Sequence, residues 1–134
     1  MKAGRHLEIL FLGISLVCVA PLAAQPPPQG VLERGKVVYE KHCAYCHGLD
    51  GKADTPVGRL LTPHPRNFAD PVEMARVSVD RIYHAIKDGR AGTAMPAWGQ
   101  VLGETQIGDV VDYVRSLATA KAITLSVEQL SLEI

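Results

Sequence analysis

The chain has 134 residues, a length that suits one domain with some N-terminal residues outside the fold. Its 14 Lys and Arg residues balance its 14 Asp and Glu residues, and the lack of a basic excess argues against a nucleic-acid-binding protein. Aromatic residues make up only 5% of the chain, which is lean for a domain that must bury enough surface to fold, so a large buried group would fill a deficit.

Residues 1–24 have the pattern of a signal peptide. Lys2 and Arg5 precede an apolar run that starts at Ile9 and ends in two alanines, small residues that suit cleavage. A membrane-spanning helix needs about 20 apolar residues, and this run is interrupted at Pro21. We therefore expect an export signal, with an uncleaved membrane anchor as the alternative.

The next residues lead into the folded domain. Residues 25–30 contain three consecutive prolines, which exclude helix and favour an extended linker. A first helix is then predicted over residues 31–42, because one face of it is formed by Val31, Gly35, Val38, Tyr39 and His42, with charged residues on the others. Gly35 costs about 1 kcal/mol relative to alanine inside a helix, so we expect it to allow close approach of a later helix.

Residues 43–47 carry the most specific motif of the chain. Two thiols three residues apart, Cys43 and Cys46, can bind a haem covalently, while the adjacent His47 takes an axial position on its iron. In the cytosol the same two thiols would suggest a thioredoxin-like redox site or half of a zinc site. Haem attachment of this kind takes place outside the cytoplasmic membrane, so the export signal and the haem motif support each other.

Residues 48–68 form a long segment rich in proline and glycine, which predicts a loop around one side of the haem. A backbone carbonyl that accepts a hydrogen bond from the His47 ring would fix its tautomer, and the carbonyls of Pro56 and Pro63 are the candidates. Two residues of this loop are candidate donors to the haem propionates, with a solvated surface position as the alternative: Arg66 and Asn67.

Two helices are predicted after this loop. The first follows Asp70 as its N-cap and carries Met74, which on a helix is more often core filler than an iron ligand. The second follows Ser78 as its cap and ends at Gly89. Its apolar stripe consists of Val79, Ile82, Tyr83 and Ile86. His84 lies off this stripe, so we expect it to be exposed.

Residues 89–99 form a glycine-punctuated loop with one methionine, Met95. A thioether is a soft, neutral ligand, and ligation by His and Met raises the reduction potential of a haem. Pro96 would stiffen the loop, since proline fixes its own φ and restricts the preceding residue to extended geometry. Met95 is therefore the best available sixth ligand, and Trp98 is expected to line the pocket.

A final helix is predicted after Gly103, with an apolar stripe of Ile107, Val110, Val111, Val114 and Leu117. Gly108 is expected to tolerate close approach of another helix, and Tyr113 to pack near Gly35 and Tyr39. The two terminal helices would then cross and close the fold.

The sequence divides into four parts. Residues 1–24 are the signal peptide or anchor, 25–30 the linker, 31–118 the folded domain and 119–134 a C-terminal extension. The extension loses the helical stripe and its apolar residues partly alternate, so it suits an edge strand, a partner contact or a loose tail.

The sequence resembles the class I monohaem c-type cytochromes of bacteria over about residues 30–117. The segments that carry the resemblance are Cys43-Ala44-Tyr45-Cys46-His47, Gly48-Leu49-Asp50-Gly51, Pro65-Arg66-Asn67-Phe68, Ala94-Met95-Pro96-Ala97-Trp98 and Tyr113-Val114-Arg115-Ser116-Leu117. The resemblance implies an all-α fold of three to four helices around one haem c, with crossing N- and C-terminal helices. It also implies thioethers at Cys43 and Cys46, His47 as proximal ligand and Met95 as distal ligand.

Three functions fit these expectations. The leading one is a periplasmic carrier of single electrons between a protein donor and a protein acceptor, which is no enzyme because a six-coordinate iron offers no open site. The second is a fixed electron-relay subunit of a larger oxidoreductase, in a membrane complex. The third is a haem peroxidase or gas sensor, which requires Met95 to be a labile ligand.

Overall fold

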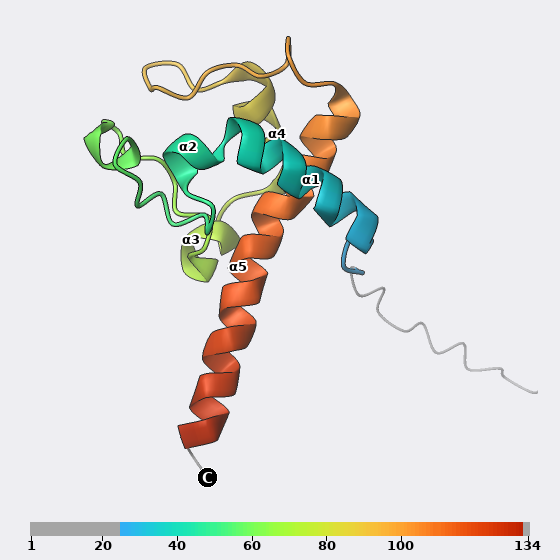
Figure 1. The fold of residues 1–134 in the computed structure, drawn as a ribbon, viewed down its shortest axis with the longest axis vertical. Helices are drawn as coiled ribbons and strands as arrows, with labels where there is room; N and C mark the ends of the chain where they lie inside the picture. Colours follow the sequence, from blue (N-terminus) through green and yellow to red (C-terminus); the bar gives the residue numbers. More distant parts are fainter. Residues whose placement is uncertain (1–24, 133–134) are drawn as a thin grey trace, which may run out of the picture.

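Helices are the only regular secondary structure in residues 25–132, which are the residues that the computed structural model describes (Figure 1). In chain order they are α1 (Gln29–His42), α2 (Ala44–His47), the 3-10 helix η1 (Gly58–Leu60), α3 (Pro71–Ala75), α4 (Val79–Asp88) and α5 (Glu104–Leu132). The predicted all-α class is confirmed. The predicted export signal, residues 1–24, lies outside the described residues. Among the helices described, none is both long and apolar enough to cross a membrane.

The first and last helices, α1 and α5, cross each other (Figure 1), and Gly35 lies at their contact. A Cβ atom at Gly35 would lie 2.7 Å from the carbonyl carbon of Asp109 and 2.9 Å from the Cβ of Tyr113. The predicted role of Gly35 is therefore confirmed, since any side chain there would collide with α5. The corresponding prediction for Gly108 is wrong: a Cβ there meets nothing within 4 Å, because α5 turns Asp109 and Tyr113 toward α1.

Polar and aromatic contacts between α1 and α5 stabilise this crossing. Arg34 donates to the buried carboxylate of Asp109 through Nε at 2.6 Å and Nη2 at 3.0 Å, a bidentate pair between α1 and α5. The rings of Tyr39 and Tyr113 lie with centroids 5.2 Å apart, as expected for Tyr113. The Tyr39 hydroxyl donates to the carbonyl of Gly48 at 2.7 Å, so α1 also holds the chain just after the haem motif.

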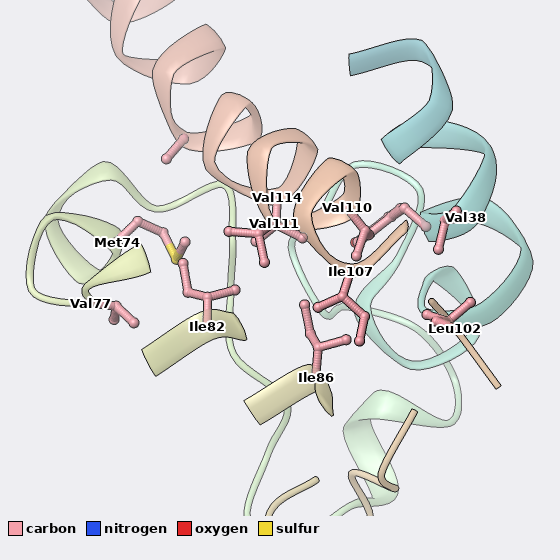
Figure 2. Close-up of a cluster of buried hydrophobic side chains, with 12 residues drawn as sticks. Val38, Met74, Val77, Ile82, Ile86, Leu102, Ile107, Val110, Val111 and Val114 are labelled. Atoms are coloured by element: carbon pink, nitrogen blue, oxygen red, sulfur yellow. The ribbon is translucent and has the colours of Figure 1, made fainter. Parts of the chain in front are cut away.

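The apolar core lies between α5 and the helices α1, α3 and α4 (Figure 2). It consists of Val38, Tyr39, Met74, Val77, Ile82, Ile86, Leu102, Ile107, Val110, Val111, Val114 and Ala118. Met74 is only 5% exposed, so its predicted place in the core is confirmed. The predicted caps are also present: Asp70 accepts from the backbone N–H groups of Val72 and Glu73, and Ser78 from that of Arg81.

The last helix is longer than predicted. α5 continues without a break to Leu132, so the edge-strand interpretation of residues 119–134 is wrong for the part that the structure describes. No glycine or proline follows Gly108 in the sequence, and nothing therefore ends the helix. In Figure 1 the C-terminal part of α5 extends away from the other helices.

Candidate functional site

One cavity of about 840 Å³ brings together residues from distant parts of the chain. Its walls come from the α1–α2 junction, the loop before α3, helix α4 and the loop after α4. All four residues that the sequence analysis singles out line it: Cys43, Cys46, His47 and Met95. Protein interiors are close-packed and leave few voids larger than a water molecule. A cavity of this size in so small a domain therefore has the dimensions of a binding site for a cofactor.

His47 is buried, with 8% of its surface exposed. Its Nδ1 lies 3.1 Å from the backbone carbonyl of Arg66, and since a carbonyl can only accept, Nδ1 carries the proton. The ring also stacks on Phe68, with centroids 4.3 Å apart and planes 14° apart. Nε2 is thereby left as the nitrogen with the free lone pair, which is the form of histidine that binds a metal ion.

The acceptor for His47 differs from the expected one. Neither Pro56 nor Pro63 provides it, because the loop presents the Arg66 carbonyl to the ring instead. Burial lowers the pKa of His47, and the bond to Arg66 opposes this shift only in part. Burial therefore favours the neutral imidazole, and the hydrogen bond holds it in a fixed orientation.

Cys43 and Cys46 lie at the junction of α1 and α2. The N–H of Cys43 donates to the carbonyl of Tyr39 at 2.8 Å, and the N–H groups of Cys46 and His47 both donate to the carbonyl of Cys43, at 3.1 and 3.0 Å. Burial, and to a lesser extent the nearby Cys46, raises the pKa of the Cys43 thiol to about 11. Catalytic thiol pairs have a lowered pKa, so this environment does not favour the thioredoxin-like interpretation.

Met95 reaches the cavity from a tight turn. The N–H of Arg90 donates to the carbonyl of Met95 at 3.1 Å. The Thr93 hydroxyl accepts from the N–H of Met95 at 3.1 Å and donates to the carbonyl of Arg90 at 2.8 Å. Met95 itself is half-buried and packs against the core cluster.

The rest of this loop is fastened to the end of α4. The N–H of Trp98 donates to the carbonyl of Ile86 at 2.9 Å, which holds the second half of the loop against α4. Gly89 has a φ of 72°, and a Cβ there would lie 2.7 Å from the backbone nitrogen of Ala97. Trp98 lines the cavity as predicted, and its ring lies 4.9 Å from that of His42.

The rim of the cavity carries more basic than acidic side chains. The basic residues that line it are Lys52, Arg66, Arg81 and Arg90, and the acidic one is Glu73. Arg66 pairs with Glu73 at 3.6 Å, and the Asn67 side chain accepts from the N–H of Ala69 at 3.0 Å. A rim of this kind suits a cofactor with carboxylate groups, and the role of Arg66 and Asn67 toward propionates stays a prediction.

Two residues with side chains that could bind iron, Met74 and His84, do not line the cavity. Met74 belongs to the core, and His84 is exposed, with Nδ1 2.9 Å from Asp88. Sequence reasoning missed the stacking of Phe68 and the Arg66 carbonyl. A backbone acceptor has no residue type by which a sequence could reveal it.

Comparison with known proteins adds to this geometry. The model of the family described as cytochrome c oxidase, cbb3-type, subunit III matches residues 30–114. The chain belongs to this family of c-type cytochromes. Membership implies a covalently bound haem with its iron and a role in electron transfer, as the resemblance predicts.

Individual relatives agree with the family match. A cytochrome c6 from Rippkaea orientalis is 34% identical over 116 residues, which are 87% of this chain and 96% of that protein. The FixPc subunit of the cbb3-type cytochrome c oxidase of Rhizobium leguminosarum bv. viciae is 31% identical over 96 residues, 72% of this chain and 31% of that subunit. The CcoP subunit from Azospirillum sp. (strain B510) is 32% identical over 77% of this chain and 34% of its own length. The chain thus spans about a third of these oxidase subunits.

Solved structures share the fold. The KustC0563 c-type cytochrome superposes with a TM-score of 0.55 at 31% identity, over 62% of this chain and 95% of its own. A chain of the Kuenenia stuttgartiensis reducing HAO-like protein complex Kustc0457/Kustc0458 gives the same TM-score and identity, over 67% of this chain and 44% of that one. The predicted small helical cytochrome fold is confirmed.

The residues of the cavity fit the haem that the family implies. The space is large enough, its walls are mostly apolar, and the two thiols, the imidazole and the thioether all face one volume. The unprotonated Nε2 of His47 is the nitrogen that a haem iron would need.

Proposed function

We propose that the protein is an exported carrier of single electrons that binds one haem c in this cavity. In this proposal Cys43 and Cys46 form the thioethers, and His47 and Met95 are the axial ligands. One observation supports it: the segment with Cys43, Cys46 and His47 and the distant loop with Met95, each with side chains of the right chemical type, line a single cavity of about 840 Å³.

Each residue has a distinct task. The bound haem supplies an iron that gains or loses one electron without forming a bond to a substrate. Cys43 and Cys46 would hold it covalently, so that it cannot dissociate. The Arg66 carbonyl keeps the proton of His47 on Nδ1, and the resulting hydrogen bond raises the basicity of Nε2. Met95, held by Thr93, would occupy the remaining position and keep exogenous ligands out.

Carbon monoxide tests this proposal. The purified, reduced protein at neutral pH should show no change in its visible spectrum when carbon monoxide is added, and it should be oxidised and reduced reversibly by one electron. Immediate binding of carbon monoxide would contradict the six-coordinate carrier and support the sensor or peroxidase interpretation. The intact mass of the purified protein should equal that of the mature chain plus one haem.

A second function is a fixed electron-relay subunit of a larger oxidoreductase. It is favoured by the family model, whose description names an oxidase subunit, and by the relatives FixPc and CcoP. Redox partners would then be neighbouring subunits, and residues 1–24 would act as an anchor. Copurification from native membranes at high salt supports this arrangement, whereas recovery of the protein from the periplasmic fraction supports the free carrier.

The division of the chain is part of the same proposal. Residues 1–24 would direct export, 25–30 would link them to the haem domain, and 31–118 would form that domain. The N-terminal sequence of the mature protein tests the first boundary: a start close to residue 25 indicates cleavage, and an intact N-terminus indicates anchoring.

A further inference from the structure

The C-terminal part of α5 exposes apolar side chains along its length. Leu125 (42% exposed) and Leu132 (86%) lie on one side of the helix, and Ile123 (60%), Val127 (60%) and Leu130 (64%) lie on the opposite side. Residues 119–132 contain two charged side chains, Lys121 and Glu128. A helix with so little charge is normally covered on at least one face.

One of its faces continues the stripe that packs against the core. Ala118, which is buried, is followed on this face by Ala122, Leu125, Gln129 and Leu132. The steps of four and three residues between these positions form a heptad pattern, which is the pattern of a helix that pairs with another helix. The small side chains of Ala118 and Ala122 lie at its base, and the larger leucines lie toward the tip.

A groove of about 230 Å³ lies at the base of the same face. It is formed by α3 and α5, and its lining consists of Pro71, Met74, Ala75, Arg115, Ala118, Thr119 and Ala122. The distance along the helix from Ala118 to Leu132 is about 21 Å at 1.5 Å per residue. A second, antiparallel copy of this helix would therefore bring its Leu132 to the groove, while its own groove receives Leu132 of the first copy.

The charges fit the same arrangement. Lys121 and Glu128 are seven residues apart and lie on one flank of the heptad face. In an antiparallel pair, Lys121 of each copy lies beside Glu128 of the other, whereas a parallel pair would place each side chain level with its own counterpart. Within residues 25–132 neither side chain has an ion-pair partner.

We propose that the occupant of this face is a second copy of the same chain, which pairs antiparallel through residues 118–132 in a two-fold symmetric dimer. The face is self-complementary in shape, with a groove at one end and a leucine tip at the other, and in charge. Two short helices bury a small interface, so the dimer is expected to be of micromolar affinity. The inference does not depend on the haem ligands.

Charge reversal tests the pairing in the haem-loaded full chain. Lys121→Glu gives two acidic residues on the flank, and Glu128→Lys gives two basic ones. By sedimentation equilibrium, the dissociation constant of each variant alone should be at least roughly ten-fold weaker than that of the unchanged protein. An equimolar mixture of the two variants should recover the dimer, since every flank contact then joins opposite charges. No recovery on mixing would overturn the antiparallel arrangement.

Two substitutions on opposite faces of the helix provide the matched comparison. Leu125→Lys should abolish the dimer, whereas Val127→Lys, at another exposed apolar position of the same helix but away from the heptad face, should leave it unchanged. The haem spectrum should stay the same in both, because neither residue lines the cavity. A protein that remains monomeric at about 500 µM, or a dimer that is lost with Val127→Lys and kept with Leu125→Lys, would overturn the proposal.

Discussion

His47 and Met95 line the same cavity, but the protein holds them in different ways. His47 is buried, stacked on Phe68 and bonded to a backbone carbonyl. Met95 is half-buried in a loop whose side-chain support is a single hydroxyl, that of Thr93. The His47 side is therefore held by burial, ring stacking and a hydrogen bond to the His47 side chain, whereas the Met95 side is held mainly by the hydrogen bonds of its loop.

This difference has a consequence for the stability of each side. Displacing His47 requires its hydrogen bond to the Arg66 carbonyl to break and its ring to leave both Phe68 and its buried position. Displacing Met95 requires only a few backbone hydrogen bonds of residues 89–99 to break, and local openings of this kind cost less than global unfolding. We expect exchange of ligands to take place on the Met95 side.

The largest effect is expected at the two cysteines. The double variant Cys43→Ala/Cys46→Ala removes both attachment points, so haem staining of a denaturing gel should fall to zero. Tyr45→Ala is the control, because this residue lies between the cysteines and is 75% exposed. It should retain full staining. Haem that survives denaturation in the double variant would contradict covalent attachment at these residues.

The helix crossing that supports the His47 side comes next. Gly35→Ala forces a Cβ against the backbone of Asp109, and we expect a loss of about 2–4 kcal/mol in the free energy of unfolding. Gly108→Ala meets no atom within 4 Å and should stabilise the helix by up to about 1 kcal/mol. Denaturant unfolding of the haem-loaded proteins measures both values. Equal effects in the two variants would contradict the crossing.

A smaller effect is expected from the ring that stacks on His47. Phe68→Leu keeps an apolar side chain but removes the stacked ring, so the free energy of unfolding should fall by about 1–2 kcal/mol. Leu60→Ala, on the same loop but 84% exposed, should change it by less than about 0.5 kcal/mol. If Phe68→Leu is as stable as the unchanged protein, the His47 side does not depend on this stacking.

The smallest effect on the free energy of unfolding is expected for a substitution of Thr93. Its effect should be confined to the loop that carries Met95. Thr93→Val removes the hydroxyl that bonds Met95 and Arg90, at a local cost of about 1 kcal/mol. Binding of added imidazole to the oxidised protein should become about five-fold tighter, since opening of the loop is favoured by that amount. Global stability should change little. Thr105→Val, at an exposed position on α5, should alter neither quantity.

Most elements that position the site could be predicted from the sequence. The caps at Asp70 and Ser78, the close approach at Gly35 and the core position of Met74 depend on residue type and spacing, which a sequence displays directly. Met95 could be singled out because a proline follows it in a loop between two helices.

Other features could not be predicted, for physical reasons. The carbonyl that bonds His47 belongs to Arg66, and every residue has a carbonyl. Gly108, like Gly35, is a glycine inside a helix, so the sequence does not distinguish the two. The rotation of α5 about its axis decides which of its residues contact α1. The apolar residues after Ala118 alternate in places and hide a heptad pattern, so the sequence does not reveal that α5 continues to Leu132.

The assignment of Met95 as the closing ligand is the central claim, and one paired measurement tests it most directly. Met95→Ala should bind carbon monoxide when reduced, and its reduction potential should fall by on the order of 100 mV, part of the roughly 0.8 V range set by axial ligands. Met74→Leu, a volume-conserving change in the core, should show neither effect. An unchanged potential and no carbon monoxide binding in Met95→Ala would contradict the account.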